Sequence, residues 1–142
     1  MSLILVAIDG SQRSERALDA VAARVRAIPT ARVELLYVHE PAIRAGRIPG
    51  VQRAEALEAL RATRAADVLK NAAERLASAG ISAGTRSAPG ELYPTIAETA
   101  RALGASEIVL GVRTPWLARV GAALARRIRP IDVLHVPVTF AS

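Results

Sequence analysis

The pattern of apolar and polar positions divides the chain into alternating strand-like and helix-like segments. The first segment, Leu3–Ile8, is apolar at all six positions, which is typical of a strand buried on both faces, as in a parallel sheet. Asp9, Gly10 and Ser11 follow at once, and this combination favours a tight turn in front of a helix. These features predict the first half of a strand–helix–strand unit.

The rest of the chain continues this alternation. Apolar residues at helical spacing predict helices over four ranges, Arg13–Ile28, Arg53–Ser78, Leu92–Leu103 and Leu117–Ile128. Apolar or alternating runs predict further strands over Arg32–His39, Ile81–Ser87, Ser106–Gly111 and Asp132–Val138. The stretch 42–52, which contains glycines and a proline without a clear period, is expected to be a connecting loop.

This order of segments predicts an α/β fold. We expect a single-domain three-layer sandwich of the flavodoxin-like type, with a five-stranded parallel sheet of order 3-2-1-4-5 and helices on both faces. In such a sheet the first and fourth strands are neighbours, so the turns after Ile8 and Leu110 flank one crevice. Ligands of open α/β sheets bind at this point, where the winding reverses.

Composition narrows the function classes. At 142 residues the chain is expected to form one domain over 1–142. It has no cysteine, which excludes disulfides, thiol catalysis and cysteine-based metal sites. His39 and His135 are the only histidines and neither has metal-ligand spacing, so no metal is expected. No apolar run reaches membrane-spanning length and no leader precedes the first strand, so a cytoplasmic location is expected.

The charge balance is strongly basic without indicating a nucleic-acid partner. The formal net charge is +6, and among nineteen basic residues only Lys70 is a lysine, which indicates a general bias toward arginine. Aromatic residues make up 3% of the chain, too few for a platform that stacks bases. The charge favours a general attraction of anions.

Several of these segments resemble the universal stress protein family. The similar segments are Ile4–Ser11, Leu35–His39, Gly104–Gly111 and Val133–Val136. The resemblance implies one universal stress protein domain of the adenine nucleotide alpha hydrolase-like type, acting in the stress response by binding and signalling, not as an enzyme. It also implies a homodimer through the last strand, Val133 to Val138, and an as yet unknown protein partner.

The loop after the fourth strand departs from the pattern of the family's ATP-binding branch. That pattern is Gly-x-x-Gly, nine further residues, then Gly-Ser or Gly-Thr. Here Gly111 is kept, but Thr114 stands at the second glycine, Gly121 comes about three residues early and Ala122 replaces the hydroxyl residue. Backbone amides and hydroxyls are what such a loop offers to phosphates. The resemblance therefore implies a degenerate phosphate loop without tight ATP binding.

The nucleotide-binding candidates lie at the ends of the predicted strands and in this loop. They are Ala7, Ile8, Asp9, Ser11, Val38, Gly111, Arg113 and Gly121. By resemblance, Asp9 lies near an adenosine and the backbone of Val38 contacts its base. Asp9 is equally interpreted as a turn residue that accepts nearby N–H groups, and Ser11 as a helix cap. Arg113 is either a guanidinium contact to phosphate in place of the lost amides or part of a solvated surface.

Two functions remain open. The first, which we favour, is an interaction protein of the stress response without tight ATP binding. The second is a protein that binds an adenine nucleotide, ATP or AMP, between the first and fourth strands. A hydrolase is disfavoured because no pair of carboxylates and no general base lies beside the loop.

Overall fold

The computed structural model describes residues 2–39, 51–111 and 134–137. Within this part of the chain, five strands form one sheet in the order β3-β2-β1-β4-β5. The strands are β1 (Leu3–Ile8), β2 (Arg32–His39), β3 (Ala83–Pro89), β4 (Glu107–Gly111) and β5 (Leu134–Pro137). The α/β fold and the strand order predicted from the sequence are confirmed.

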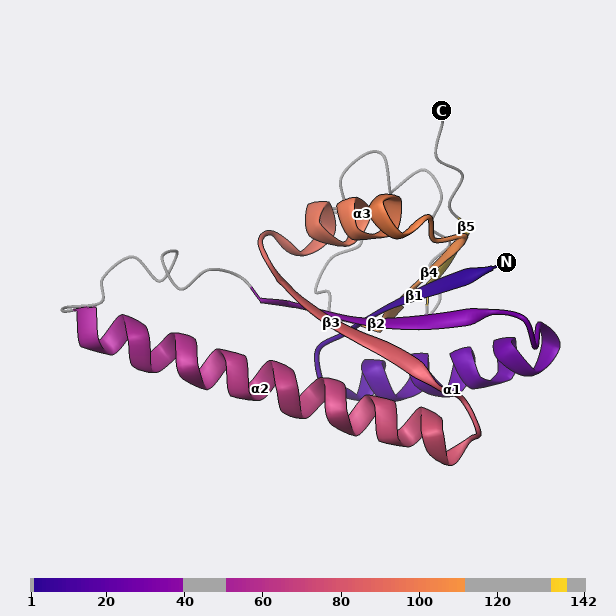
Figure 1. Cartoon of the computed structure of the whole chain (residues 1–142), viewed down its shortest axis with the longest axis horizontal. Coiled ribbons are helices and arrows are strands. Elements are labelled where there is room, and N and C mark those ends of the chain that lie inside the picture. Colours follow the sequence, from indigo (N-terminus) through magenta and orange to yellow (C-terminus); the bar gives the residue numbers. More distant parts are fainter. Residues whose placement is uncertain (1, 40–50, 112–133, 138–142) are drawn as a thin grey trace.

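Helices cover both faces of the sheet. They are α1 (Gln12–Ala27), α2 (Val51–Ser78) and α3 (Leu92–Leu103). Figure 1 shows α1 and α2 on one face and α3 on the other, which gives three layers. This placement follows from right-handed crossovers. The connections from β1 to β2 and from β2 to β3, through α1 and α2, move in one direction across the sheet, whereas the connection from β3 to β4, through α3, moves back in the other and so lies on the opposite face. In the described part of the chain, no helix combines the length and apolarity needed to cross a membrane.

The strand β1 lies at the centre of the core. Its residues from Ile4 to Ile8 are all buried. Ile4, Val6 and Ile8 pack with α1 and α2, whereas Leu5 and Ala7 pack with α3. A strand that is covered on both faces has no position for a polar side chain, which explains the unbroken apolar run.

The two neighbours of β1 set the geometry of the predicted crevice. β1 is parallel to both β2 and β4, with Ala7 beside Leu36 and Ile8 beside Gly111. The carboxyl ends of β1 and β4 therefore end side by side, at the place where the order of winding reverses.

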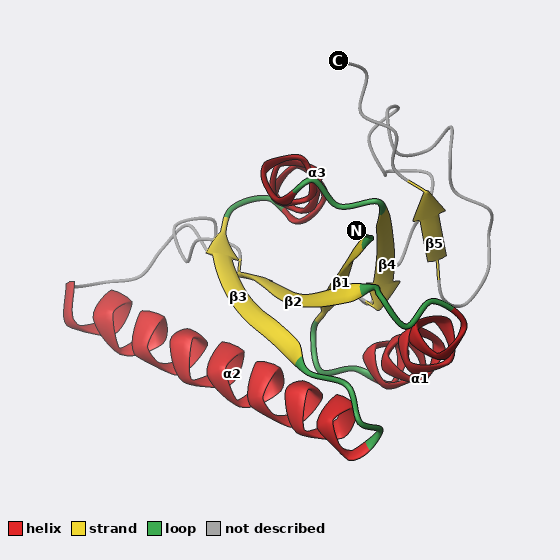
Figure 2. Ribbon diagram, turned by 45° about the vertical axis from the view of Figure 1, so that its right-hand side comes forward, coloured by secondary structure: helices red, strands yellow, loops and turns green. Residues whose placement is uncertain are grey.

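One strand runs in the direction opposite to that expected. β5 pairs antiparallel with β4, Leu110 opposite Leu134 and Glu107 opposite Pro137, whereas the sequence predicted parallel strands throughout. Figure 2 shows the two arrows pointing in opposite directions. An antiparallel neighbour starts at the end of the sheet where the preceding strand finished, so it needs no crossover to the other end. The alternation of segments predicts which residues form strands, but it does not fix the direction of the last one.

Other boundaries shift only slightly. The third strand is expected to start at Ile81 but begins at Ala83, because Ile81 still belongs to the turn after α2, where its N–H donates to the carbonyl of Leu76. Residues 51 and 52, expected in a loop, are the first residues of α2. The helix expected over Leu117–Ile128 and most of the loop expected over 42–52 lie outside the described residues.

Candidate functional site

The turn after β1 is built around Gly10 and the carboxylate of Asp9. Gly10 has φ +83°, a left-handed conformation that glycine adopts without strain. Asp9 Oδ1 accepts the backbone N–H of Ser11 at 2.9 Å. The turn role expected for Asp9 is therefore present, and the adenosine role stays a prediction.

Ser11 differs from expectation. It holds the N-cap position of α1 with extended backbone angles, but its hydroxyl makes no capping hydrogen bond. Its Oγ is buried and has no hydrogen-bond partner among the described residues. The prediction that the Ser11 hydroxyl caps the helix is therefore wrong, although Ser11 does hold the N-cap position.

Ser14, in the first turn of α1, holds the end of β1 against the end of β4. Its Oγ accepts the N–H groups of Asp9 at 2.8 Å and Gly10 at 3.2 Å. The same oxygen lies 2.5 Å from the carbonyl oxygen of Gly111 and 3.0 Å from Asp9 Oδ1, both acceptors for its hydrogen. A contact across 97 positions of sequence thus joins the two walls of the crevice.

This role of Ser14 was missed from the sequence, because Ser14 is not among the binding candidates named there. A signal did exist in the sequence. Ser14 lies three, four and seven positions before Ala17, Leu18 and Val21, and so on the apolar stripe of an amphipathic helix. A serine on that stripe is buried, and a buried hydroxyl needs partners.

Position 111 needs a glycine because of close packing and not because of a turn conformation. Gly111 is the last residue of β4, is buried, and is not among the glycines with positive φ in the described chain. A Cβ at this position would lie 2.6 Å from Ala17 Cβ and 3.0 Å from Ser14 Cα. The missing side chain therefore lets α1 approach β4 closely enough for the Ser14 contact.

The remaining described candidates offer mainly backbone to a ligand. The side chains of Ala7 and Ile8 are buried in the core, on opposite faces of the sheet. Val38 is half-buried and packs on the α3 side. Continuing the pairing of Ala7 with Leu36 by two residues places Val38 level with Asp9. Arg113 and Gly121 lie outside the described residues, so the phosphate side of the prediction stays untested.

The opposite end of β4 is also tied to α1. The carboxylate of Glu107 accepts hydrogen bonds from the Nη2 and Nε groups of Arg24, at 2.7 and 3.1 Å. Hydrogen bonding and the charge of Glu107 raise the pKa of Arg24 above its ordinary value. Ser14 and Arg24 therefore hold α1 at both ends of β4.

A small hollow opens beside the turn, on the side of α2. It has a volume of about 270 Å³, and its lining includes Ile8, Gly10 and Ser11 together with Val68 and Arg75 of α2. Arg75 forms a salt bridge with the carboxylate of Asp19 at 3.1 Å. In the described residues no group of histidine, cysteine, aspartate or glutamate is arranged to hold a metal ion.

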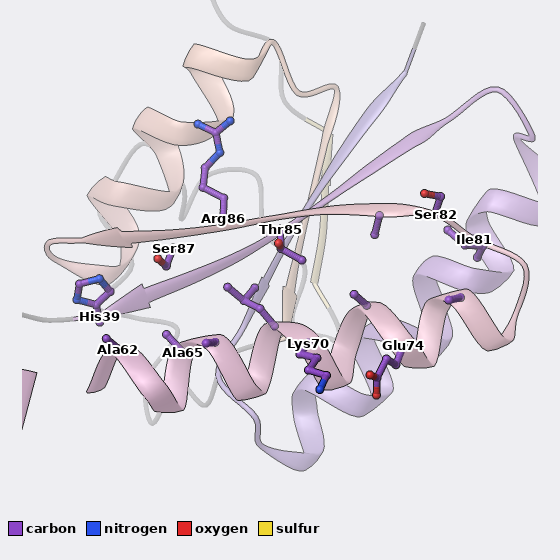
Figure 3. A pocket seen from close by; sticks show the side chains of 15 residues that line it. His39, Ala62, Ala65, Lys70, Glu74, Ile81, Ser82, Thr85, Arg86 and Ser87 are labelled. Atoms are coloured by element: carbon purple, nitrogen blue, oxygen red, sulfur yellow. The ribbon is translucent and has the colours of Figure 1, made fainter. Parts of the chain in front are cut away.

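A larger groove of about 800 Å³ runs between α2 and the edge strand β3. Figure 3 shows Ala62 and Ala65 of α2 facing this groove, with Thr85 and Ser87 of β3 opposite. The short alanine side chains on this face of the helix leave the space open. None of the candidates named from the sequence lines it.

Comparison with protein families connects this geometry to a known group. The model of the universal stress protein family matches residues 1–137. The search of curated proteins gave no match. The fold is similar to a crystal structure of a protein of that family from Burkholderia pseudomallei, with 32% identity, 78% of this chain and 81% of that chain covered, and a TM-score of 0.63.

More distant structures share the fold. The universal stress protein UspA from Lactobacillus plantarum is 22% identical over 87% of this chain and 88% of its own, with a TM-score of 0.68. A family protein from Arabidopsis thaliana, solved with AMP bound, is 14% identical over 89% of this chain and 85% of its own, with a TM-score of 0.64. Other structures with this fold were solved in complex with cAMP and with dAMP.

Proposed function

The chain belongs to the universal stress protein family, and from this premise we propose that it is a stress-response binding protein for an adenine nucleoside monophosphate. The proposed site is the crevice between the carboxyl ends of β1 and β4. The protein binds and signals there, holds ATP only weakly and has no catalytic cycle of its own.

One observation carries this proposal: the hydrogen bonds of Ser14 bring Asp9 and Gly111 together from distant parts of the sequence. The carboxylate of Asp9 is an acceptor suited to a ribose hydroxyl or an adenine amino group. Val38, level with Asp9, supplies backbone groups to the base in our proposal. The reversal of winding between β1 and β4 is where sheets of this class bind their ligands.

A monophosphate is favoured over a triphosphate by the sequence after β4. Thr114 and Ala122 remove a glycine and a hydroxyl that the ATP-binding branch of the family has, and Pro115 has no N–H to donate. A single phosphate needs fewer donors than three. The family protein from Arabidopsis thaliana was solved with AMP, which supports this ligand class.

Two measurements test the proposal. The purified protein is denatured and the released small molecules are identified, and the emptied protein is titrated calorimetrically with AMP, ATP and adenosine. We expect AMP to bind at least about tenfold more tightly than ATP, a difference of about 1.4 kcal/mol. Asp9→Asn is expected to weaken AMP by a similar factor, because the amide is a poorer acceptor than the carboxylate.

Other outcomes contradict the proposal. Tight binding of ATP would mean that the loop after β4 holds a triphosphate despite its sequence. No binding of any adenine compound would favour the interaction protein without a nucleotide, the function that the degenerate loop by itself indicates.

We also propose that the protein is a homodimer formed through its last strand, Val133 to Val138. Residues 134–137 of this segment are described, and they form β5 at one edge of the sheet. The outer side of an edge strand offers unpaired N–H and C=O groups, which a second copy of the strand can satisfy.

A further inference from the structure

The hydroxyl of Ser14 has more partners than it has hydrogens. A serine hydroxyl offers one hydrogen and two lone pairs. The N–H groups of Asp9 and Gly10 occupy both lone pairs. Two acceptors then remain for one hydrogen, the carbonyl oxygen of Gly111 at 2.5 Å and Asp9 Oδ1 at 3.0 Å. The hydroxyl therefore donates fully to only one of them at a time.

The hydrogen bond from Ser14 to the carbonyl of Gly111 is buried. The exposed fraction of Ser14 is 3%, and Gly111, with no side chain, lies directly against it. A hydrogen bond in such a place is stronger than one in water, and a partner left without it is costly. The position of the single hydrogen consequently affects both walls of the crevice.

We propose that Ser14 is a positioning residue that couples the two sides of the β1–β4 crevice through this one hydrogen. The inference rests on the proposed function, because the ligand that shifts the hydrogen is the adenine nucleotide. A ligand hydroxyl or amino group that donates to Asp9 Oδ1 competes with Ser14 for that oxygen. The Ser14 hydrogen then goes wholly to the carbonyl of Gly111 and holds the point at which the chain leaves β4.

The coupling implies an order in which the ligand contacts form. In the proposed function Asp9 contacts the adenosine, and Gly111 is the last residue before the sequence that departs from the family's phosphate-binding pattern. When the sugar or base engages Asp9, the last residue of β4 is fixed more firmly before any phosphate contact is made. Ser14 touches no ligand in this scheme and acts through its two neighbours.

An isosteric pair of variants isolates the hydroxyl. Ser14→Thr and Ser14→Val have the same shape, but only the threonine keeps an O–H, so any crowding by the extra methyl group is common to both. Ser106→Ala is the matched control. The Ser106 hydroxyl donates to the carbonyl of Leu3 at 3.2 Å, and so joins the same two strands at their opposite ends.

The first measurement is amide hydrogen exchange in the nucleotide-free proteins, which does not depend on ligand binding. We expect the amides of Asp9 and Gly10 to exchange about tenfold faster in Ser14→Val than in Ser14→Thr, because valine offers them no acceptor. Ser106→Ala should leave both rates within about twofold of the wild type. Equal rates in the valine and threonine variants would overturn the inference.

The second measurement is the affinity for AMP, with the cycle formed by Asp9→Asn and Ser14→Val. We expect Ser14→Val to bind AMP about tenfold more weakly than Ser14→Thr. The double variant should lose less affinity than the product of the two single losses, because both substitutions act through the same hydrogen bond. Fully independent losses would overturn the coupling. If the wild type binds no AMP, the proposed function fails, and the exchange rates alone decide whether Ser14 positions the two strand ends.

Discussion

At the scale of single residues, the site depends on groups that are small or buried. Gly111 has no side chain and so lets α1 approach β4 closely, and the buried hydroxyl of Ser14 on α1 then contacts the carbonyl of Gly111. Asp9 could be named from the sequence because an Asp-Gly-Ser turn after an apolar strand is a local pattern. The Ser14 contact could not, because its partner Gly111 is 97 positions away.

Gly111→Ala should destabilise the protein although it adds only a methyl group. The new Cβ would lie 2.6 Å from Ala17 Cβ, so α1 must move away from β4. We expect a loss of about 1–3 kcal/mol in the free energy of unfolding, measured by urea denaturation.

A second substitution, at Ala17, tests whether the contact between the new Cβ and Ala17 causes that loss of stability. Ala17→Gly removes the methyl group that the new Cβ meets and is expected to lower stability by about 1 kcal/mol by itself. The double variant should be more stable than the sum of the two effects predicts, by about 0.5 kcal/mol or more. Strict additivity would show that Ala17 is not what excludes a side chain at position 111.

At the scale of elements, α2 has two halves with different environments. Its 28 residues span about 42 Å, far more than the seven residues of β3 beside it. Residues 55–60 are exposed, whereas Ala65, Leu69, Ala72 and Leu76 are buried against the sheet. Figure 1 shows the amino-terminal end of the helix extending past the sheet. The helical period was readable along its whole length, but the sheet decides which half is buried.

Two leucines of this helix should therefore differ in their contribution to stability. Leu76 is 1% exposed and Leu60 is 67% exposed. We expect Leu76→Ala to lower the free energy of unfolding by about 2–5 kcal/mol, through lost burial and the cavity left behind. Leu60→Ala should change it by no more than about 0.5 kcal/mol. Chemical denaturation of both variants measures the difference, and similar losses would mean that the exposed half of α2 is covered in solution.

At the scale of the whole molecule, the two edges of the sheet are unlike each other. β3 forms one edge; its residues Gly84 to Ser87 are exposed, and Arg86 is paired with Glu34 of β2 at 3.5 Å. β5 forms the other edge of the described sheet, antiparallel to β4. Charged residues and exposed polar positions protect an edge from pairing, so the dimer that we propose would form through β5 and not through β3.

A lysine placed on each edge tests this assignment. Val136→Lys is expected to convert the dimer into a monomer, because the charge must be desolvated where two strands meet. Thr85→Lys on β3 should leave the dimer intact. Sedimentation velocity measures the oligomeric state, and circular dichroism verifies that both variants are folded. A wild-type monomer, or a dimer lost only in Thr85→Lys, would contradict the assignment.

The sequence by itself determined the class of the fold, the identity of the strands and helices that the structure describes, and the turn that carries Asp9. These depend on local periodicity and on the conformational preferences of glycine, aspartate and proline, which act over a few neighbouring residues. The strand order also followed, because short right-handed connections leave few alternatives.

Only the tertiary structure decided the direction of β5, the reason for Gly111 and the role of Ser14. Each of these depends on two segments that meet only when the sheet is assembled. A hydroxyl on an apolar stripe shows that some partner is needed, but it does not say which one. That choice is made by the packing of α1 on β4, which brings one buried oxygen within reach of both strand ends.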